Sequence, residues 1–131
     1  MDIEKIQQKI DQTDYWDAPI YDFQINFFGD QVSMAIANDD ISYWKICFKH
    51  CKSLYYESFC SWKNEKGEPI SVCDMNKHQL DFFGQDITVF PADISDFLKV
   101  TFNLSFLSGQ IICREIEVEK KPKIPGEFFW E

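Results

Sequence analysis

Apolar and polar residues alternate along three consecutive segments in the first half of the chain. The apolar positions are Tyr21, Phe23, Ile25 and Phe27, then Val32, Met34 and Ile36, and finally Trp44, Ile46 and Phe48. Gly29-Asp30 and Asn38-Asp39-Asp40 separate the segments, and these residue types favour turns. Because a strand with one buried face shows a period of two, the pattern predicts three strands of an antiparallel meander.

A further alternation in the second half of the chain predicts a hairpin. Its apolar positions are Leu98, Val100, Phe102, Leu104 and Phe106. Ser108-Gly109 follows as the expected turn, and residues 111–119 are expected to return as the second strand. Shorter strands are predicted at residues 54–59, 70–75 and 87–90, with a polar loop at residues 62–69.

Three isoleucines at helical spacing, Ile3, Ile6 and Ile10, predict a short amphipathic helix over residues 2–10. We expect one domain over residues 1–131, in which an antiparallel β core at residues 20–119 follows the helix and precedes a Pro-containing aromatic tail at residues 120–131. An aromatic share of 17% suits a β-rich interior. The predicted fold class is mainly β, an antiparallel sandwich or strongly curled sheet with a short N-terminal helix.

The tail contains Pro122 and Pro125, which lack the N–H donor that a central strand needs. It ends in the rings of Phe128, Phe129 and Trp130, which are costly to leave in water. We expect these rings to dock on the same chain, and the alternatives are a neighbouring copy or a partner. They are therefore candidate contacts for a homo-oligomer.

The charge is strongly acidic and uneven. The chain has 22 Asp and Glu against 13 Lys and Arg, a net charge of −9, and residues 1–40 alone hold nine acids against two lysines. This charge disfavours nucleic acids and anionic membranes as partners. It serves either solubility or the attraction of a basic protein. The candidate partner-binding residues are Asp14, Trp16, Asp17, Tyr21, Asp39 and Asp40, although Trp16 is also expected to fill the edge of the core.

Five cysteines and an acidic N-terminus predict free thiols in the cytoplasm. No stretch reaches the roughly 18 apolar residues that a membrane span needs. His50 and His78 do not lie at a metal-ligand spacing, and the acids at residues 38–40 lack the pattern of a calcium loop, so we expect no metal and no cofactor.

No spacing of Ser, His, Cys, Asp or Glu indicates a catalytic site, and we expect a protein that is not an enzyme. The best candidate for chemistry is His78, because Asp74 or Asp81 could orient its ring. The main alternative to a protein-binding domain is a β domain that encloses a small apolar ligand, since an aromatic-rich interior of this size can leave a cavity.

A resemblance to known proteins rests on the order of four features. These are Tyr43-Trp44-Lys45-Ile46 with Phe48, then Tyr56-Glu57, then Phe83-Gly84-Gln85-Asp86-Ile87, and a last hairpin that ends in residues 116–119. Over residues 20–119 the chain resembles small bacterial proteins of the toxin-immunity type. A single Arg beside 12 Lys is consistent with an AT-rich bacterial genome. The resemblance implies a non-enzymatic protein-binding domain, an immunity-type inhibitor whose acidic surface occupies a basic protein partner.

Overall fold

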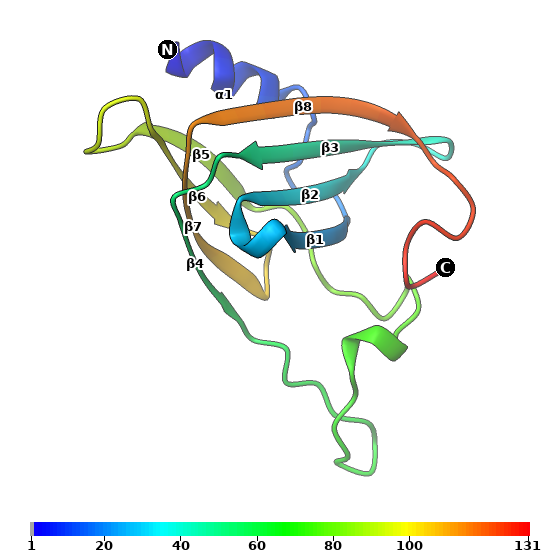
Figure 1. The fold of residues 1–131 in the computed structure, drawn as a ribbon. Coiled ribbons are helices and arrows are strands. Elements are labelled where there is room, and N and C mark those ends of the chain that lie inside the picture. The colour runs from blue at the N-terminus through cyan, green and yellow to red at the C-terminus, as the bar shows by residue number, and fades with distance from the viewer. Residues whose placement is uncertain (1) are drawn as a thin grey trace.

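Two antiparallel sheets share one hydrophobic core, and a helix lies across one open side between them (Figure 1). The computed structural model describes residues 2–131. The elements are α1 (Ile3–Asp11), β1 (Ile20–Asn26), β2 (Gln31–Ala37), β3 (Ser42–Lys49), β4 (Ser53–Ser58), β5 (Asp86–Pro91), β6 (Leu98–Asn103), β7 (Leu107–Cys113) and β8 (Glu115–Pro122), with 3-10 turns η1 (Phe27–Gly29) and η2 (Val72–Asp74). The strand orders are β1-β2-β3-β8 and β4-β7-β6-β5. The predicted mainly β class with a short N-terminal helix is confirmed.

The two sheets are connected by a pair of strands that bend from one sheet into the other. β3 continues into β4 through residues 50–52, and β7 continues into β8 through Arg114. His50 has a positive φ of 53°, and the Arg114 N–H donates to the Lys49 carbonyl at 3.2 Å, so the two bends lie beside each other. The prediction of one strand over residues 111–119 is therefore wrong, because Arg114 divides it between the sheets.

The predicted turn at Ser108-Gly109 is also wrong. Both residues lie inside β7, and the turn is formed by residues 104–106, where Ser105 has a φ of 74°. A Cβ at Gly109 would lie 2.1 Å from the Tyr55 carbonyl oxygen and 3.0 Å from the Phe102 ring. Gly109 is therefore required for close packing and not for a turn.

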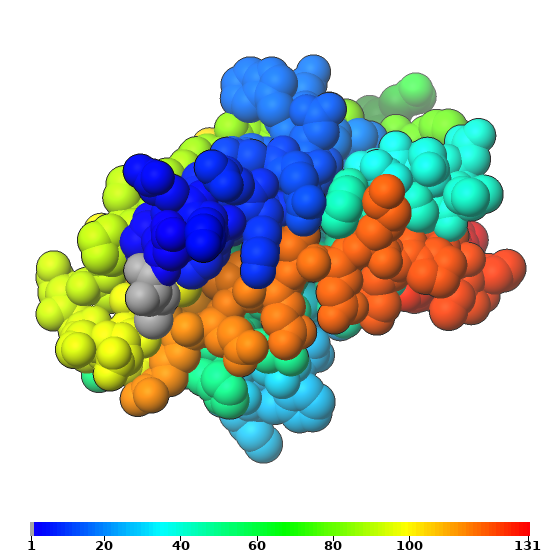
Figure 2. Space-filling model, turned by 90° about the horizontal axis from the view of Figure 1, so that it is seen from above, coloured from blue at the N-terminus to red at the C-terminus, as the bar shows by residue number. Residues whose placement is uncertain are grey.

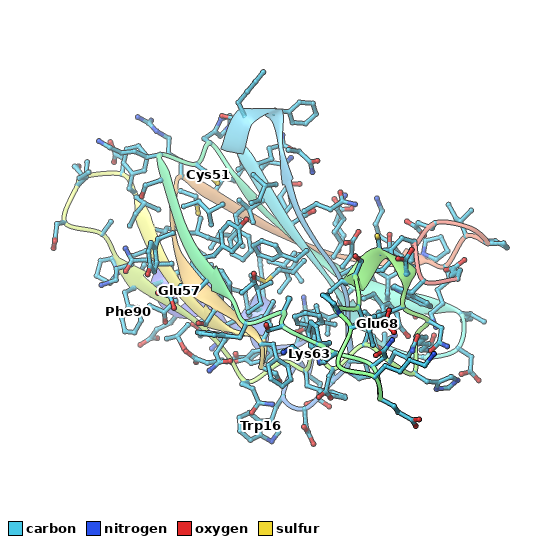
Figure 3. The ribbon with its side chains drawn as sticks, turned by 90° about the horizontal axis from the view of Figure 1, so that it is seen from below. Trp16, Cys51, Glu57, Lys63, Glu68 and Phe90 are labelled. Atoms are coloured by element: carbon cyan, nitrogen blue, oxygen red, sulfur yellow. The ribbon has the colours of Figure 1, made fainter. Side chains whose placement is uncertain are left out.

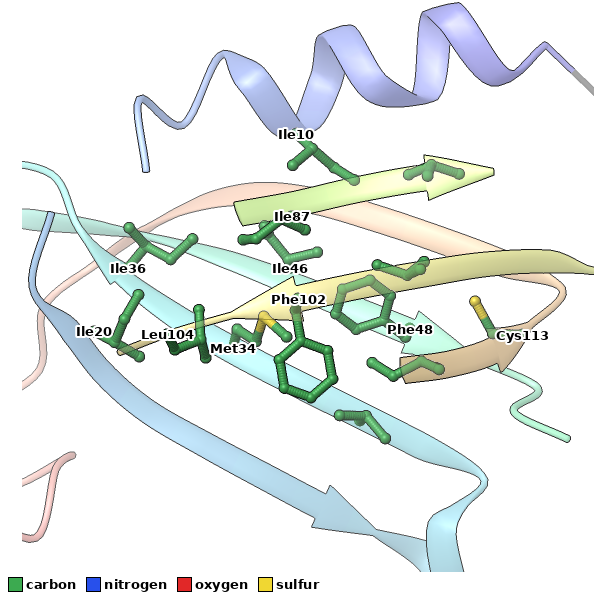
Figure 4. Close-up of a cluster of buried hydrophobic side chains, with 14 of the residues drawn as sticks. Ile10, Ile20, Met34, Ile36, Ile46, Phe48, Ile87, Phe102, Leu104 and Cys113 are labelled. Carbon is green, nitrogen blue, oxygen red and sulfur yellow. The ribbon is translucent and has the colours of Figure 1, made fainter. Parts of the chain in front are cut away.

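Helix α1 closes the side of the sandwich between β5 and β8 (Figure 2). Asp2 caps its N-terminus by accepting a hydrogen bond from the Lys5 N–H at 3.2 Å. Ile10 is fully buried against the core, close to Ile87 of β5 (Figure 4). The helix begins and ends one residue later than predicted.

The core lies between the inner faces of the two sheets. Met34, Ile36, Ile46 and Phe48 come from the first sheet, and Ile87, Phe102 and Cys113 come from the second (Figure 4). The second sheet also contributes Val100 and Ile111. The alternation in β2, β3 and β6 correctly predicts the strand face that packs on this core, but Trp44 is only half-buried. Ser33, Ala35 and Tyr43 on the opposite face are buried as well, which the alternation did not predict.

Residues 70–75 contain turn η2 (Val72–Asp74) in place of the predicted strand. The segment is held by side-chain contacts: Met75 is buried, and the Trp62 ring packs edge-on against Phe82 and Phe106 at centroid distances of 5.7 and 5.4 Å. This long connection between β4 and β5 carries the exposed polar residues Lys63 and Glu68 (Figure 3).

β8 extends to Pro122, three residues beyond the predicted limit of the β core. Pro122 is tolerated because β8 is an edge strand.

After β8 the chain docks on its own first sheet. Phe128 is only 6% exposed, with its ring 5.4 Å from that of Tyr21 and 5.1 Å from that of Tyr43. Trp130 stacks on Phe128 at 5.2 Å, and its Nε1–H donates to the Tyr21 carbonyl at 2.8 Å.

Candidate partner-binding surfaces

Four of the predicted partner-binding residues lie at one end of the first sheet. Asp14 and Asp17 belong to the connection between α1 and β1, and Asp39 and Asp40 belong to the turn between β2 and β3. The Ala37 N–H donates to the Pro19 carbonyl at 2.9 Å, which brings the two loops to the same end. All four carboxylates are exposed. We call these four residues, together with Trp16, the acidic end.

The loop that carries Trp16 is held in a defined conformation. Asp14 and Asp17 have positive φ values of 50° and 59°, which Asp tolerates better than most residues. The Asp17 N–H donates to the Gly84 carbonyl at 2.7 Å, and a Cβ at Gly84 would lie 2.1 Å from the Tyr15 carbonyl oxygen. Tyr15 packs on the core, whereas Trp16 is 67% exposed and points away from the molecule (Figure 3). The expectation that Trp16 fills the edge of the core is wrong, because Tyr15 occupies that position.

The aspartates of the acidic end form no salt bridge within the described residues, although the charge of Lys120 acts on Asp39. Within residues 2–131 the salt bridges are Lys49–Glu117 at 2.8 Å and His50–Glu115 at 3.8 Å, and neither includes an aspartate of the acidic end. The Asp39 carboxylate accepts hydrogen bonds from the Ser42 hydroxyl at 2.7 Å and the Ile41 N–H at 3.0 Å, and these bonds lower the pKa of Asp39. The carboxylate therefore stays ionised to lower pH than an ordinary aspartate.

Tyr21 does not lie with the acidic end. Its ring is 5% exposed and packs under Phe128 and Trp130 of the tail. The ammonium groups of Lys77 and Lys123 lie 5.3 and 5.1 Å from the ring centroid. Tyr21 is thus inaccessible to a partner while the tail is docked, and Phe129, which is 49% exposed, is the tail ring most available to a second copy.

A second exposed surface lies at the opposite end of β1 and was not expected from the sequence. Phe27, Phe28 and Gly29 form the turn between β1 and β2, with φ values of 54°, 57° and 92°. We call these three residues the aromatic tip. Phe27 is 72% exposed and Phe28 is fully exposed. A left-handed backbone is a genuine outlier for a bulky residue, and such strain is concentrated at functional sites.

A shallow groove of about 560 Å³ separates the aromatic tip from the beginning of β4. One wall contains Ile25 and the tip, and the other contains Cys51, Lys52, Ser53 and Leu54. Cys51 lies in the bend between β3 and β4, and Glu57 lies further along β4 (Figure 3). The prediction that Phe27 continues the strand alternation of β1 is wrong, because β1 ends at Asn26 and Phe27 begins the turn. The sequence signal for this surface was the pair Phe27-Phe28 directly before Gly29-Asp30.

An apolar pocket of about 170 Å³ lies between β1 and the connection that precedes β5. Its lining includes Ile20, Phe23, Leu80 and Leu107, and Phe129 of the tail. Pockets that bind drug-sized ligands enclose about 300–1,000 Å³. The pocket is therefore too small for such a ligand.

Metal ligands, thiols and histidines are the groups of this chain that could support catalysis. Within residues 2–131 no three His, Cys, Asp or Glu side chains are placed to hold a metal ion. Burial raises the pKa of Cys113 to about 12 and that of Cys51 to about 11, so both thiols are poor nucleophiles at neutral pH. His78 is exposed, and its backbone N–H donates to Asn76. Among the described residues, no helix has the length and apolar character to cross a membrane.

These features define a small two-sheet β protein whose distinctive chemistry lies on an exposed acidic end and an exposed aromatic tip. The chain matches the family model described as immunity protein PIM7 over residues 2–120. It therefore belongs to this family, and the resemblance to toxin-immunity proteins is confirmed. A search of curated protein sequences found no match.

Proposed function

We propose that this chain protects its cell by binding a toxin protein and blocking it, without catalysing a reaction. The observation that carries the proposal is the family match over residues 2–120, which spans both sheets and the helix. The exposed surfaces support it, because exposed aromatic rings are typical of protein-binding surfaces and carboxylates outside the salt bridges of residues 2–131 are available to attract a basic partner.

The acidic end is the part of this surface that attracts the toxin. Most of the net charge of −9 comes from residues 1–40, and the four aspartates of the acidic end are exposed and outside any salt bridge of the described chain. A field of this sign raises the association rate with a basic protein. Trp16, between two of these aspartates, supplies apolar contact area, as tryptophan often does in protein interfaces.

The complex forms in the cytoplasm of the bacterium that makes the chain. All five cysteines are free, and this supports a reducing compartment.

Growth protection tests the proposal. A toxin domain encoded beside the gene for this chain is expressed in a test bacterium, with and without the chain. Protection is expected, together with a complex of the two purified proteins. Continued killing in the presence of the folded, soluble chain would contradict the proposal for that toxin.

A further inference from the structure

Three of the four sheet edges are protected against pairing with another strand, and β5 shows this most clearly. The Gln7 side chain of α1 donates to the Ile87 carbonyl at 2.9 Å and accepts from the Val89 N–H at 2.8 Å. The amide group of Gln7 thus takes the place of a neighbouring strand. Open strand edges invite association, and covering them with a helix is a common protection.

β8 and β1 are protected in other ways. β8 carries Glu, Lys and the terminal Pro122 along its edge. β1 has a bulge between Ile20 and Asp22, and the Asp22 carboxylate accepts a hydrogen bond from the Phe23 N–H at 2.9 Å. The beginning of β1 is covered as well, because the Ile20 N–H donates to the Phe82 carbonyl at 2.9 Å.

β4 has none of these protections. Residues Ser53–Ser58 include no Lys, no Pro and no break in register with β7, and their only charge is that of Glu57. Five of the six residues are exposed, including both tyrosines, Tyr55 and Tyr56. An edge strand this regular and this exposed is a ready template for strand addition.

The pairing of β4 with β7 shows which backbone groups of β4 are free to bind another strand. The Phe59 N–H donates to the Phe106 carbonyl at 2.8 Å, in the register of β4 with β7. Backbone groups alternate in direction along a strand, so those of Leu54, Tyr56 and Ser58 point away from β7. Among the hydrogen bonds of the described chain outside the sheet ladders, none engages these three residues.

The groove beside the aromatic tip lies along the first part of this edge. Its lining includes Ser53 and Leu54 of β4, with Ile25, Phe27 and Phe28 on the other side. A strand added to β4 would direct every second side chain toward the inner face of the sheet, and the groove offers space for an apolar one.

The geometry points to the free edge of β4 as the element that receives the toxin: an extended segment of a basic partner protein pairs with β4 as an additional strand and places an apolar side chain in the groove. This inference rests on the proposed function. A second copy of the chain is a poorer occupant, because two molecules that each carry −9 repel each other.

Residue-resolved amide hydrogen exchange tests the pairing. In the chain alone, the amides of Leu54, Tyr56 and Ser58 are expected to exchange fast, while those of Tyr55 and Glu57 are slow. In the complex with the toxin domain that the chain neutralises, the three fast amides should slow at least tenfold. A neutralising complex in which their exchange is unchanged would overturn strand addition and leave the proposed function intact.

Substitution with proline separates the backbone donor from the side chain. Tyr56→Pro removes a donor on the open edge without removing a bond to β7, and Tyr56→Ala loses the ring but keeps the donor. We expect Tyr56→Pro to bind the toxin at least tenfold more weakly than Tyr56→Ala. Ser58→Pro against Ser58→Ala repeats the comparison where no ring is lost, and it decides the matter if Tyr56→Pro does not fold.

Three other outcomes would overturn the inference. One is equal toxin affinity within each proline and alanine pair. Another is a dimer of the chain alone, seen by sedimentation, in which the same three amides are protected, because the occupant would then be a second copy. The third is the absence of both a complex and protection, which would overturn the proposed function as well.

Discussion

Phe27 and Phe28 adopt a backbone conformation that costs an L-residue about 1–2 kcal/mol. Their rings are exposed, so packing within the chain does not offset this cost. Gly29 has a positive φ that costs glycine little, which makes the two phenylalanines before it the anomaly. In the proposed complex, contact of these rings with the toxin explains why large residues stand at positions where glycine or asparagine would be more stable.

Phe28→Gly is expected to raise the free energy of unfolding by about 0.5–1 kcal/mol, because relief of the strain exceeds the entropic cost of glycine. The same substitution should weaken toxin binding at least tenfold. Chemical denaturation and a binding titration measure the two effects. Phe90→Ala, which removes an exposed ring from β5, is the matched control and should leave toxin binding unchanged. A less stable Phe28→Gly variant would contradict the strain argument.

Among the elements, the meander β1-β2-β3 and the residues of β2 and β3 that face the main core could be predicted, because alternation reports which strand face meets the other sheet. The burial of Ala35 and Tyr43 on the opposite face could not, because the tail covers them. The sheet-switching bend at Arg114 could not, since a strand that leaves one sheet for another keeps its alternation. Gly109 was misread because glycine serves both turns and close backbone contacts. The exposure of the predicted aspartates follows from their turn positions, whereas the burial of Tyr21 depends on a tail that returns from the other end of the chain. Partner binding by these residues stays a prediction.

The docked tail stabilises the first sheet mainly through Phe128. Phe128→Ala is expected to lower the free energy of unfolding by about 3–4 kcal/mol, because the ring is buried against Tyr21 and Tyr43. Phe129→Ala, one residue further, should cost about 0.5 kcal/mol or less. Chemical denaturation of both variants measures the difference. Equal losses would mean that the tail does not dock in this way.

Tyr43 gives the tail a dependence on pH. Burial, together with a hydrogen bond donated to the Glu127 carboxylate at 2.5 Å, raises the pKa of Tyr43 well above its usual value near 10. The stabilisation from the neutral phenol is therefore complete below pH 10 and is lost as the pH rises from there toward the folded-state pKa. The difference in Tm between the unaltered chain and Tyr43→Phe should shrink between pH 9 and pH 11. A difference that stays constant over this range would contradict the assignment.

For the whole molecule, charge and shape have separate roles in the proposed complex. The acidic end governs the association rate, and the β4 edge with the aromatic tip governs the bound state. The electrostatic attraction that raises the association rate depends on ionic strength, because salt screens charges over about 8–10 Å at physiological concentrations. Strand pairing at β4 depends much less on ionic strength.

The triple variant Asp14→Asn, Asp17→Asn and Asp40→Asn removes three charges while asparagine tolerates the left-handed backbone at residues 14 and 17. We expect its association rate with the toxin to fall about tenfold at low salt, with little change in the dissociation rate. The control variant Glu65→Gln, Glu68→Gln and Asp93→Asn removes three exposed acids elsewhere. Stopped-flow kinetics at low and high salt compare the two, and equal losses would attribute the effect to net charge alone.

A titration of toxic activity with the purified chain tests the central claim most directly. An inhibitor that acts by binding should reduce the activity of the toxin in proportion to the amount of chain added, until activity ends near one equivalent. Loss of all activity at a small fraction of an equivalent would mean that the chain modifies the toxin catalytically. Full activity at several equivalents would mean that this toxin is not its target.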